Sequence, residues 1–191
     1  YEVAVQYGGL EEWFADENPK HAVRIDQGFW VSKYEITKGE WHRIMGTRPW
    51  EDSEGDANLQ GPATSLSWEE CVEFVKVLTR KGEGVFRLPT ESEWGYACRA
   101  GTDSPFFFGG EVAALDEHAW YLGNTRPKNE HHVHPIGKKQ PNPWGLHDVL
   151  GNAWEWCGDA YTAYPRSENS APQDLYRVIR GGCFNSTAAF T

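Results

Sequence analysis

The chain has 191 residues, and its 18 Lys and Arg against 28 Asp and Glu give a formal net charge of −10. This acidic balance argues against a nucleic-acid partner, because such proteins neutralise phosphates with Lys and Arg. No run of about 18 apolar residues occurs, so the sequence predicts no membrane span. The length suits one domain over residues 1–191 with a single large core.

Aromatic residues are unusually frequent: ten Trp, nine Phe and eight Tyr accompany 20 Gly and 11 Pro. This mixture predicts a core of large aromatic side chains held by many irregular loops. The four cysteines lie far apart, which favours small buried hydrophobic residues over a disulfide framework or a zinc site. They are Cys71, Cys98, Cys157 and Cys183. Because no signal peptide is visible and the chain begins at Tyr1, cytoplasmic and exported locations both stay open.

Three short helices are predicted by one repeated pattern, a Ser or Thr followed three residues later by Glu. This capping box satisfies backbone N–H groups at both ends of the first turn. The helices are expected after Thr37, Ser67 and Thr90. The second is expected to end near Lys81 and the third at Gly101, since glycine favours helix termination.

The predicted strands are short, and long stretches are predicted to be loops. Alternating apolar residues predict strands at 22–26, 28–36 and 176–180. Residues 101–146 and 158–175 are rich in Gly, Pro, Asn and Asp, and loops of this length often form binding surfaces. The fold class is therefore α+β with short strands, a few helices and much irregular chain.

Two carboxylates, Asp148 and Glu155, flank a Gly151-Asn152 turn inside tryptophan-rich sequence. Carboxylates in apolar surroundings need a partner, because an unpaired buried charge is very costly. A hard cation held by oxygen ligands is one solution. The other is that Asp148 caps a turn while Glu155 accepts hydrogen bonds from backbone amides. The spacing alone does not decide between them.

Two further clusters have a functional and a structural interpretation. The segment 130–134 contains three histidines, and imidazoles suit zinc or copper, but the spacing favours a solvated loop edge. The triplet 106–108 consists of three phenylalanines. These form either an exposed contact patch or, as is commoner for such residues, part of the core.

Three blocks resemble the formylglycine-generating-enzyme/sulfatase-modifying-factor family, whose fold looks like a variant of the C-type-lectin fold. The first is Phe29-Trp-Val-Ser-Lys-Tyr-Glu-Ile-Thr37, and the second runs from Phe86-Arg-Leu-Pro-Thr to Thr102. The third runs from Asn142-Pro-Trp-Gly through Trp156 and is followed by Arg177-Val-Ile-Arg-Gly-Gly182. They lie in the family's order, so the resemblance covers nearly the whole chain.

The resemblance implies a structural calcium ion in the loop 148–155. Carried over by position, its ligands are the side chains of Asp148 and Glu155 and the carbonyl groups of Gly151 and Ala153. Calcium accepts such mixed oxygen ligands. The family also continues beyond the position of Thr191 into a closing strand, so we expect that this chain lacks that strand and that more sequence follows.

The resemblance also implies where catalysis would occur. Oxidases of the family bind copper with two cysteines, and the matching positions here are Ser186 and Thr191. A hydroxyl is a poor copper(I) ligand. Cys183 stands where the family usually has Ser and has no cysteine partner at the required spacing. We therefore expect no copper and no oxidase activity.

The favoured hypothesis is a non-catalytic binding domain from a bacterium or phage, contacting a protein or small-molecule ligand through its loops. One branch of the fold comprises variable proteins of diversity-generating retroelements, which change just after the Arg-Gly-Gly strand. The alternatives are a copper-dependent oxidase that converts a sulfatase Cys to formylglycine, and an accessory domain of a larger protein. The expected ligand-binding residues are Cys183, Asn185, Ser186, Thr187, Phe190 and Thr191.

Overall fold

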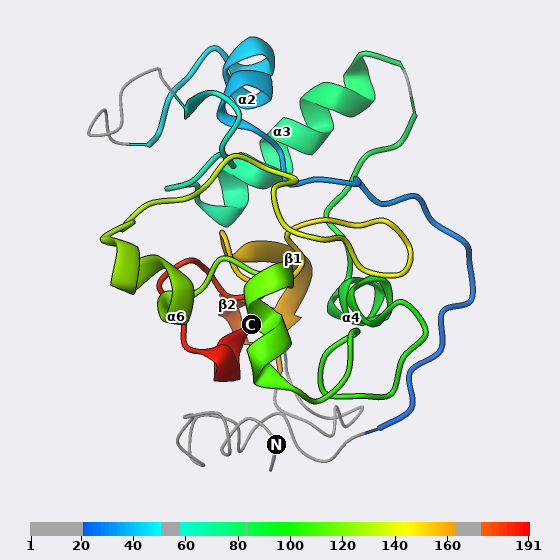
Figure 1. The fold of residues 1–191 in the computed structure, drawn as a ribbon. Coiled ribbons are helices and arrows are strands. Elements are labelled where there is room, and N and C mark those ends of the chain that lie inside the picture. The colour runs from blue at the N-terminus through cyan, green and yellow to red at the C-terminus, as the bar shows by residue number, and fades with distance from the viewer. Residues whose placement is uncertain (1–20, 51–57, 83, 163–172) are drawn as a thin grey trace.

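The computed structural model describes residues 21–50, 58–82, 84–162 and 173–191 (Figure 1). Three helices of eight or more residues and a two-stranded sheet form its regular part, and short helical turns interrupt the loops. The longer helices are α2 (Lys38–Met45), α3 (Trp68–Arg80) and α4 (Glu91–Arg99), and the strands are β1 (Glu155–Tyr161) and β2 (Gln173–Arg180). The short elements are η4 (Val112–Ala114), α5 (Leu115–His118), α6 (Leu122–Thr125), η5 (Arg126–Lys128) and η6 (Ala188–Phe190).

The three predicted capping boxes are confirmed. The hydroxyl groups of Thr37, Ser67 and Thr90 each accept a hydrogen bond from the backbone N–H three residues later. In return, the Glu at that position accepts from the backbone N–H of the capping residue. The third of these glutamates, Glu93, also holds the Arg87 guanidinium at 2.6 Å, and this contact lowers the pKa of Glu93 to about 2.

The sheet differs in part from the predicted strands. The predicted strand 176–180 is confirmed within β2, which pairs antiparallel with β1 and places Glu155 opposite Arg180. The predicted strands at 22–26 and 28–36 are wrong, because residues 21–36 run as irregular chain along one side of the molecule (Figure 1). Alternation indicates one buried face, but a strand also needs a neighbouring edge with which to pair. The loop predicted from residue 158 onward is wrong for 158–161, which belong to β1. Gly158 and Asp159 are residues that disfavour a strand when the sequence is considered alone.

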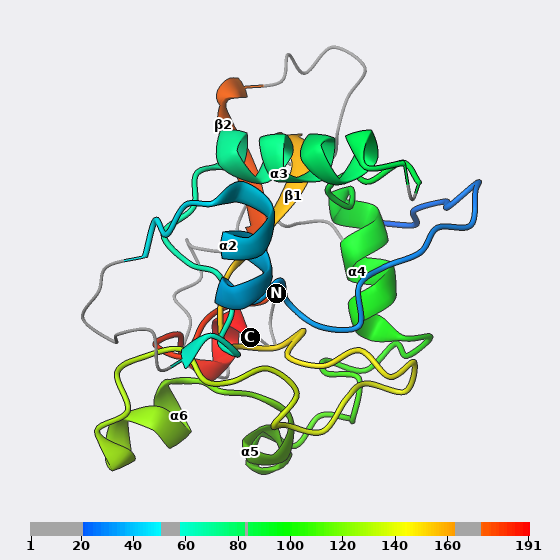
Figure 2. The ribbon, with the colours of Figure 1, turned by 90° about the horizontal axis from the view of Figure 1, so that it is seen from above.

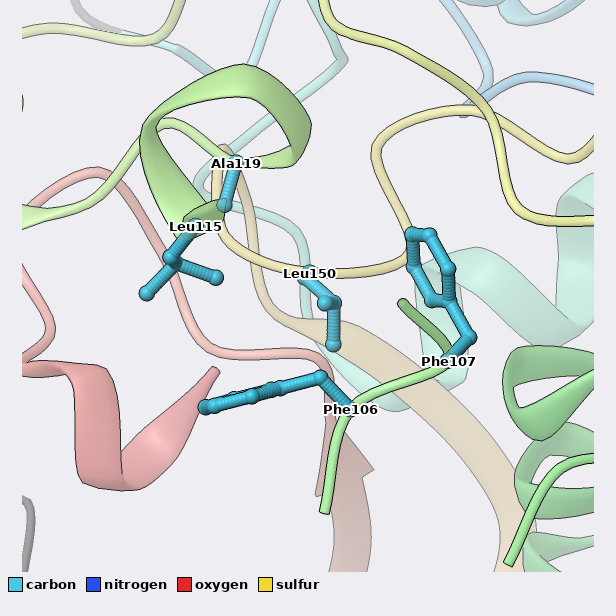
Figure 3. Close-up of a cluster of buried hydrophobic side chains, with 5 residues drawn as sticks. All are labelled: Phe106, Phe107, Leu115, Ala119 and Leu150. Carbon is cyan, nitrogen blue, oxygen red and sulfur yellow. The ribbon is translucent and has the colours of Figure 1, made fainter. Parts of the chain in front are cut away.

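The core has two aromatic centres. Near α2 and α3, Trp41 stacks on Phe74 with ring centroids 5.0 Å apart. Around α5, Phe106 and Phe107 pack with Leu115, Ala119 and Leu150 (Figure 3). The core interpretation of the phenylalanine triplet is therefore correct for its first two members.

Two tryptophan N–H groups hold α3, and the segment that leads into it, against strand β1. The indole N–H of Trp68 donates to the Cys157 carbonyl at 2.9 Å, and that of Trp156 donates to the Leu66 carbonyl at 3.0 Å. Seen from above, α3 lies across the strands while α5 and α6 lie on the opposite side of the molecule (Figure 2). The sheet is thus the centre around which the loops are arranged.

The four cysteines are all free, and Cys157 is buried while the other three are half-buried. This agrees with their expected role as small hydrophobic residues. Within the described part of the chain, no helix is both long and apolar enough to cross a membrane.

Candidate functional site

The Gly151-Asn152 turn requires an unusual backbone. Both residues have positive φ, 78° for Gly151 and 59° for Asn152, so the turn predicted at this pair is present and is left-handed. A Cβ atom on Gly151 would lie 2.1 Å from the carbonyl oxygen of Trp120, which only glycine avoids. The Gly151 N–H donates to the Gly181 carbonyl at 2.7 Å, so the turn touches the start of the C-terminal segment.

Asn152 is fully buried and joins four separate parts of the chain. Its amide oxygen accepts from the His134 backbone N–H at 2.9 Å, and its NH₂ group donates to Glu35 at 2.7 Å. Its own backbone N–H donates to Trp120, while its carbonyl accepts from the Phe184 N–H at 3.0 Å. One side chain and its peptide groups therefore set the relative positions of four loops.

Three carboxylates lie beside this turn. Glu35 accepts from Asn152 and from the Ala153 N–H, and Glu155 accepts from the Trp94 indole at 2.8 Å. Burial raises the pKa of Glu155 to about 7, against an ordinary value of 4.5. Burial and the charges of Glu155 and Asp148 raise the pKa of Glu35 well above its ordinary value. The group therefore needs protons or a cation to offset its mutual repulsion.

Asp148 carries the observation that best fits a cation. It is 1% exposed, and burial raises its pKa. One carboxylate oxygen accepts from the Gly137 N–H at 2.6 Å, whereas the other is buried without a hydrogen-bond partner. A buried carboxylate oxygen that lacks a hydrogen-bond partner is a suitable ligand for a hard cation. No cluster of three or more His, Cys, Asp or Glu with metal-binding geometry occurs among the described residues, but the expected set has only two carboxylates.

The C-terminal segment folds back on the glycine pair that precedes it. A Cβ atom on Gly182 would lie 2.3 Å from the Phe190 carbonyl oxygen, so the close approach of η6 depends on this glycine. The Ser186 hydroxyl accepts from the Cys183 N–H at 3.0 Å and lies 3.4 Å from its sulfur atom. The Thr191 hydroxyl donates to the Ala188 carbonyl.

Contacts with α6 hold this segment in place. The Thr125 hydroxyl donates to the Phe184 carbonyl at 2.8 Å, and the Leu122 N–H donates to the Ser186 carbonyl at 2.9 Å. Both views show the segment beside α6 (Figures 1 and 2). The sequence gives no signal for Thr125, because its partner lies 59 positions away in a segment without regular structure.

The expected ligand-binding residues differ in exposure. Asn185 is exposed, whereas Ser186 is only 8% exposed and supports the segment from within. The other four are half-buried: Cys183, Thr187, Phe190 and Thr191. The structure thus brings all six together on one short turn and a 3₁₀ helix.

The expectation of a solvated histidine cluster is correct for His131 and His132 and wrong for His134. His134 is 7% exposed and stacks on Trp120 with centroids 3.7 Å apart. Its ring nitrogen Nε2 lies 3.2 Å from a Glu130 carboxylate oxygen. The reason for the difference is tertiary, since the backbone of His134 is held by Asn152 inside the protein.

Comparison with known proteins identifies the family. A family model described as the sulfatase-modifying factor enzyme 1-like domain matches residues 2–191, so the chain belongs to this family. The formylglycine-generating enzyme of Bos taurus is 30% identical over 162 residues, covering 75% of this chain and 41% of the bovine protein. The chaperone protein LppX of Paenibacillus barcinonensis is 24% identical, covering 94% of this chain and 77% of LppX. The chain thus spans less than half of the bovine enzyme.

Solved structures confirm the expected type of fold. Treponema denticola variable protein 1 superposes with a TM-score of 0.65 at 26% identity, covering 82% of this chain and 75% of that one. PvdO from Pseudomonas aeruginosa superposes with a TM-score of 0.74 at 24% identity, covering 92% and 76%. The chain has the fold of formylglycine-generating enzymes, with short helices, a two-stranded sheet in the described part and much loop.

Replacing Asn152 tests its role as the connection between the loops. Asn152→Gly keeps a residue that tolerates positive φ, but it removes the partner of one Glu35 carboxylate oxygen and of the His134 N–H. We expect a loss of about 3 kcal/mol in the free energy of unfolding, measured by urea denaturation. Asn185→Ala, at an exposed asparagine, is the control and is expected to change it by less than about 0.5 kcal/mol. Equal effects of the two substitutions would contradict this role.

Proposed function

We propose that this chain is a binding domain without oxidase activity, which presents residues 183–191 to a protein or small-molecule ligand. One observation carries the proposal. The two positions that correspond to the family's copper-binding cysteines hold the hydroxyl groups of Ser186 and Thr191, and both are engaged in hydrogen bonds within the segment. These groups cannot supply the soft thiolate ligands that copper(I) requires.

The surroundings of the segment support ligand presentation. Its backbone is hydrogen-bonded to Asn152 and α6, and these bonds fix the positions from which the exposed and half-buried side chains extend. Asn185, Thr191 and the ring of Phe190 contribute to this surface, whereas the Thr187 hydroxyl is buried. Such mixtures are typical of binding loops, because the polar groups adapt while the ring supplies contact area. An anchored backbone also lowers the entropy lost on binding.

A direct test of the non-catalytic proposal is to restore the cysteine pair. The wild-type chain is expected neither to bind copper(I) stoichiometrically nor to convert the Cys of a sulfatase-type peptide to formylglycine. The double variant Ser186→Cys/Thr191→Cys is expected to gain copper(I) affinity by at least tenfold, measured by competition with a chromogenic chelator. Copper binding together with peptide turnover by the wild type would instead establish the alternative function, an oxidase like the bovine relative.

The similarity to a variable protein favours a more specific form of the proposal, in which a retroelement diversifies this segment. Sequenced copies of the locus are then expected to differ only after residue 182, chiefly at positions 185, 187, 190 and 191. Gly182 and Ser186 are expected to stay constant, because one permits the close approach of η6 and the other bonds to the backbone. Identical copies, or differences spread evenly along the chain, would exclude diversification and leave a fixed binding segment or an accessory domain.

We also propose that a structural calcium ion binds at the loop 148–155. The side chains of Asp148 and Glu155 and the carbonyl groups of Gly151 and Ala153 would hold it. Support comes from the Asp148 oxygen that is buried without a partner and from the mutual repulsion of the neighbouring carboxylates. A bound ion would stabilise the loop and would take no part in chemistry.

The calcium proposal predicts a pH-dependent stabilisation. Because the folded-state pKa of Glu155 is raised to about 7, the metal-free protein gains stability from its protonation below pH 4.5 and loses it as the pH rises through 7. Calcium binds the ionised form, so the melting temperature is expected to rise more on adding calcium at pH 8 than at pH 5.

The protein is refolded in chelator before this measurement to remove any retained ion. Glu155→Gln is expected to abolish most of the calcium-dependent rise, whereas Glu73→Gln, at an exposed ion pair on α3, is expected to leave it unchanged. A wild-type melting temperature at pH 8 that is the same with calcium and with chelator would refute the site.

A further inference from the structure

Positive charge is concentrated in one loop of this acidic chain. Residues 126–139, which we call the basic loop, contain four Lys or Arg and a single acid, Glu130, although the chain as a whole carries −10. The four cations are Arg126, Lys128, Lys138 and Lys139. The loop starts where α6 ends and runs past the buried His134.

Three of these cations are exposed and lack an acidic partner among the described residues: Arg126, Lys128 and Lys138. Lys139 instead donates to the Asp116 carbonyl and lies near the carboxylates of Asp116, Asp148 and Glu130. The Glu130 carboxylate is engaged by the imidazole of His134. The basic loop therefore exposes three cations, and the exposed acids Asp116 and Glu117 border it beside Lys139 and Gln140.

Trp120 holds the basic loop in shape. The His134 ring lies parallel to one face of the indole at 3.7 Å, so the Lys139 ammonium, 4.1 Å from the ring centroid, lies over the other face. The Lys128 ammonium is 5.8 Å from the same ring. Burial and then the charge of Lys128 lower the pKa of Lys139. Two like charges are thus held near each other before any ligand arrives, which favours a ligand that carries negative charge.

We propose that the basic loop is a docking surface for an acidic polypeptide segment of a partner protein. Carboxylates spaced along a peptide are complementary to separate ammonium, guanidinium and imidazole groups, and such complementarity directs association. Two other polyanions fit less well. The basic loop itself exposes no large hydrophobic side chain that would anchor in a bilayer. His134 stacks on Trp120 and the Lys139 ammonium lies over its ring, so the indole is not available to stack on bases.

The proposal does not depend on residues 183–191. The basic loop follows α6, the helix that supports that segment, so one partner can contact both surfaces or two partners can use them separately. Because different side chains carry the two proposals, each is tested by its own substitutions.

The test measures binding of a deca-glutamate peptide by fluorescence anisotropy at low ionic strength. The triple variant Arg126→Ala/Lys128→Ala/Lys138→Ala is expected to bind at least tenfold more weakly than the wild type; Lys139 is left in place because it packs on Trp120. The matched control, Arg43→Ala/Lys76→Ala/Lys81→Ala, removes the same charge from exposed positions elsewhere. Arg43 lies on α2, Lys76 lies on α3, and Lys81 directly follows α3. This control is expected to change the affinity by less than twofold.

Binding of the wild type is also expected to weaken as salt is added, because the contacts are between exposed charges. Equal weakening by the two triple variants would overturn the proposal, since net charge alone would then explain binding. Failure of the wild type to bind the peptide would do the same. Tighter binding of duplex DNA or of phosphatidylserine vesicles than of the peptide would overturn the choice of partner.

Discussion

Asn152 and the left-handed turn that contains it determine how the loops of this protein meet. Its side chain and peptide groups contact Glu35, Trp120, His134 and Phe184, which belong to four segments that are distant in sequence. The preceding Gly151 is required because the Trp120 carbonyl approaches too closely for any Cβ atom. In a fold with so little regular structure, buried polar groups of this kind take over the task that sheet hydrogen bonds perform elsewhere.

The same turn concentrates negative charge inside the protein. Glu35, Asp148 and Glu155 surround it, and burial raises the pKa of each. A loop that gathers carboxylates in this way depends on protons or on a cation for its stability. The raised pKa values of these carboxylates are therefore linked to the stability of the scaffold and not to a catalytic step. One buried oxygen of Asp148 has no hydrogen-bond partner among the described residues.

The family defines the scaffold, whereas individual side chains define what the scaffold does. Residues 183–191 are held by Asn152 and α6, and the hydroxyl groups of Ser186 and Thr191 form hydrogen bonds within this segment. The neighbouring basic loop adds a second surface whose charge is opposite to that of the chain as a whole. Both features support the proposed role in binding.

The sequence by itself determined the helix starts and the family, because a capping box is a contact between residues three positions apart and the motif blocks are contiguous. It also indicated the Gly151-Asn152 turn, since few residues accept a positive φ. Only the tertiary structure decided the rest. Residues 22–36 alternate like strands but run as irregular chain, and His134 looks exposed but is held inside by Asn152. The bond between Asn152 and Glu35 spans 117 positions, and no local pattern encodes a contact at that separation.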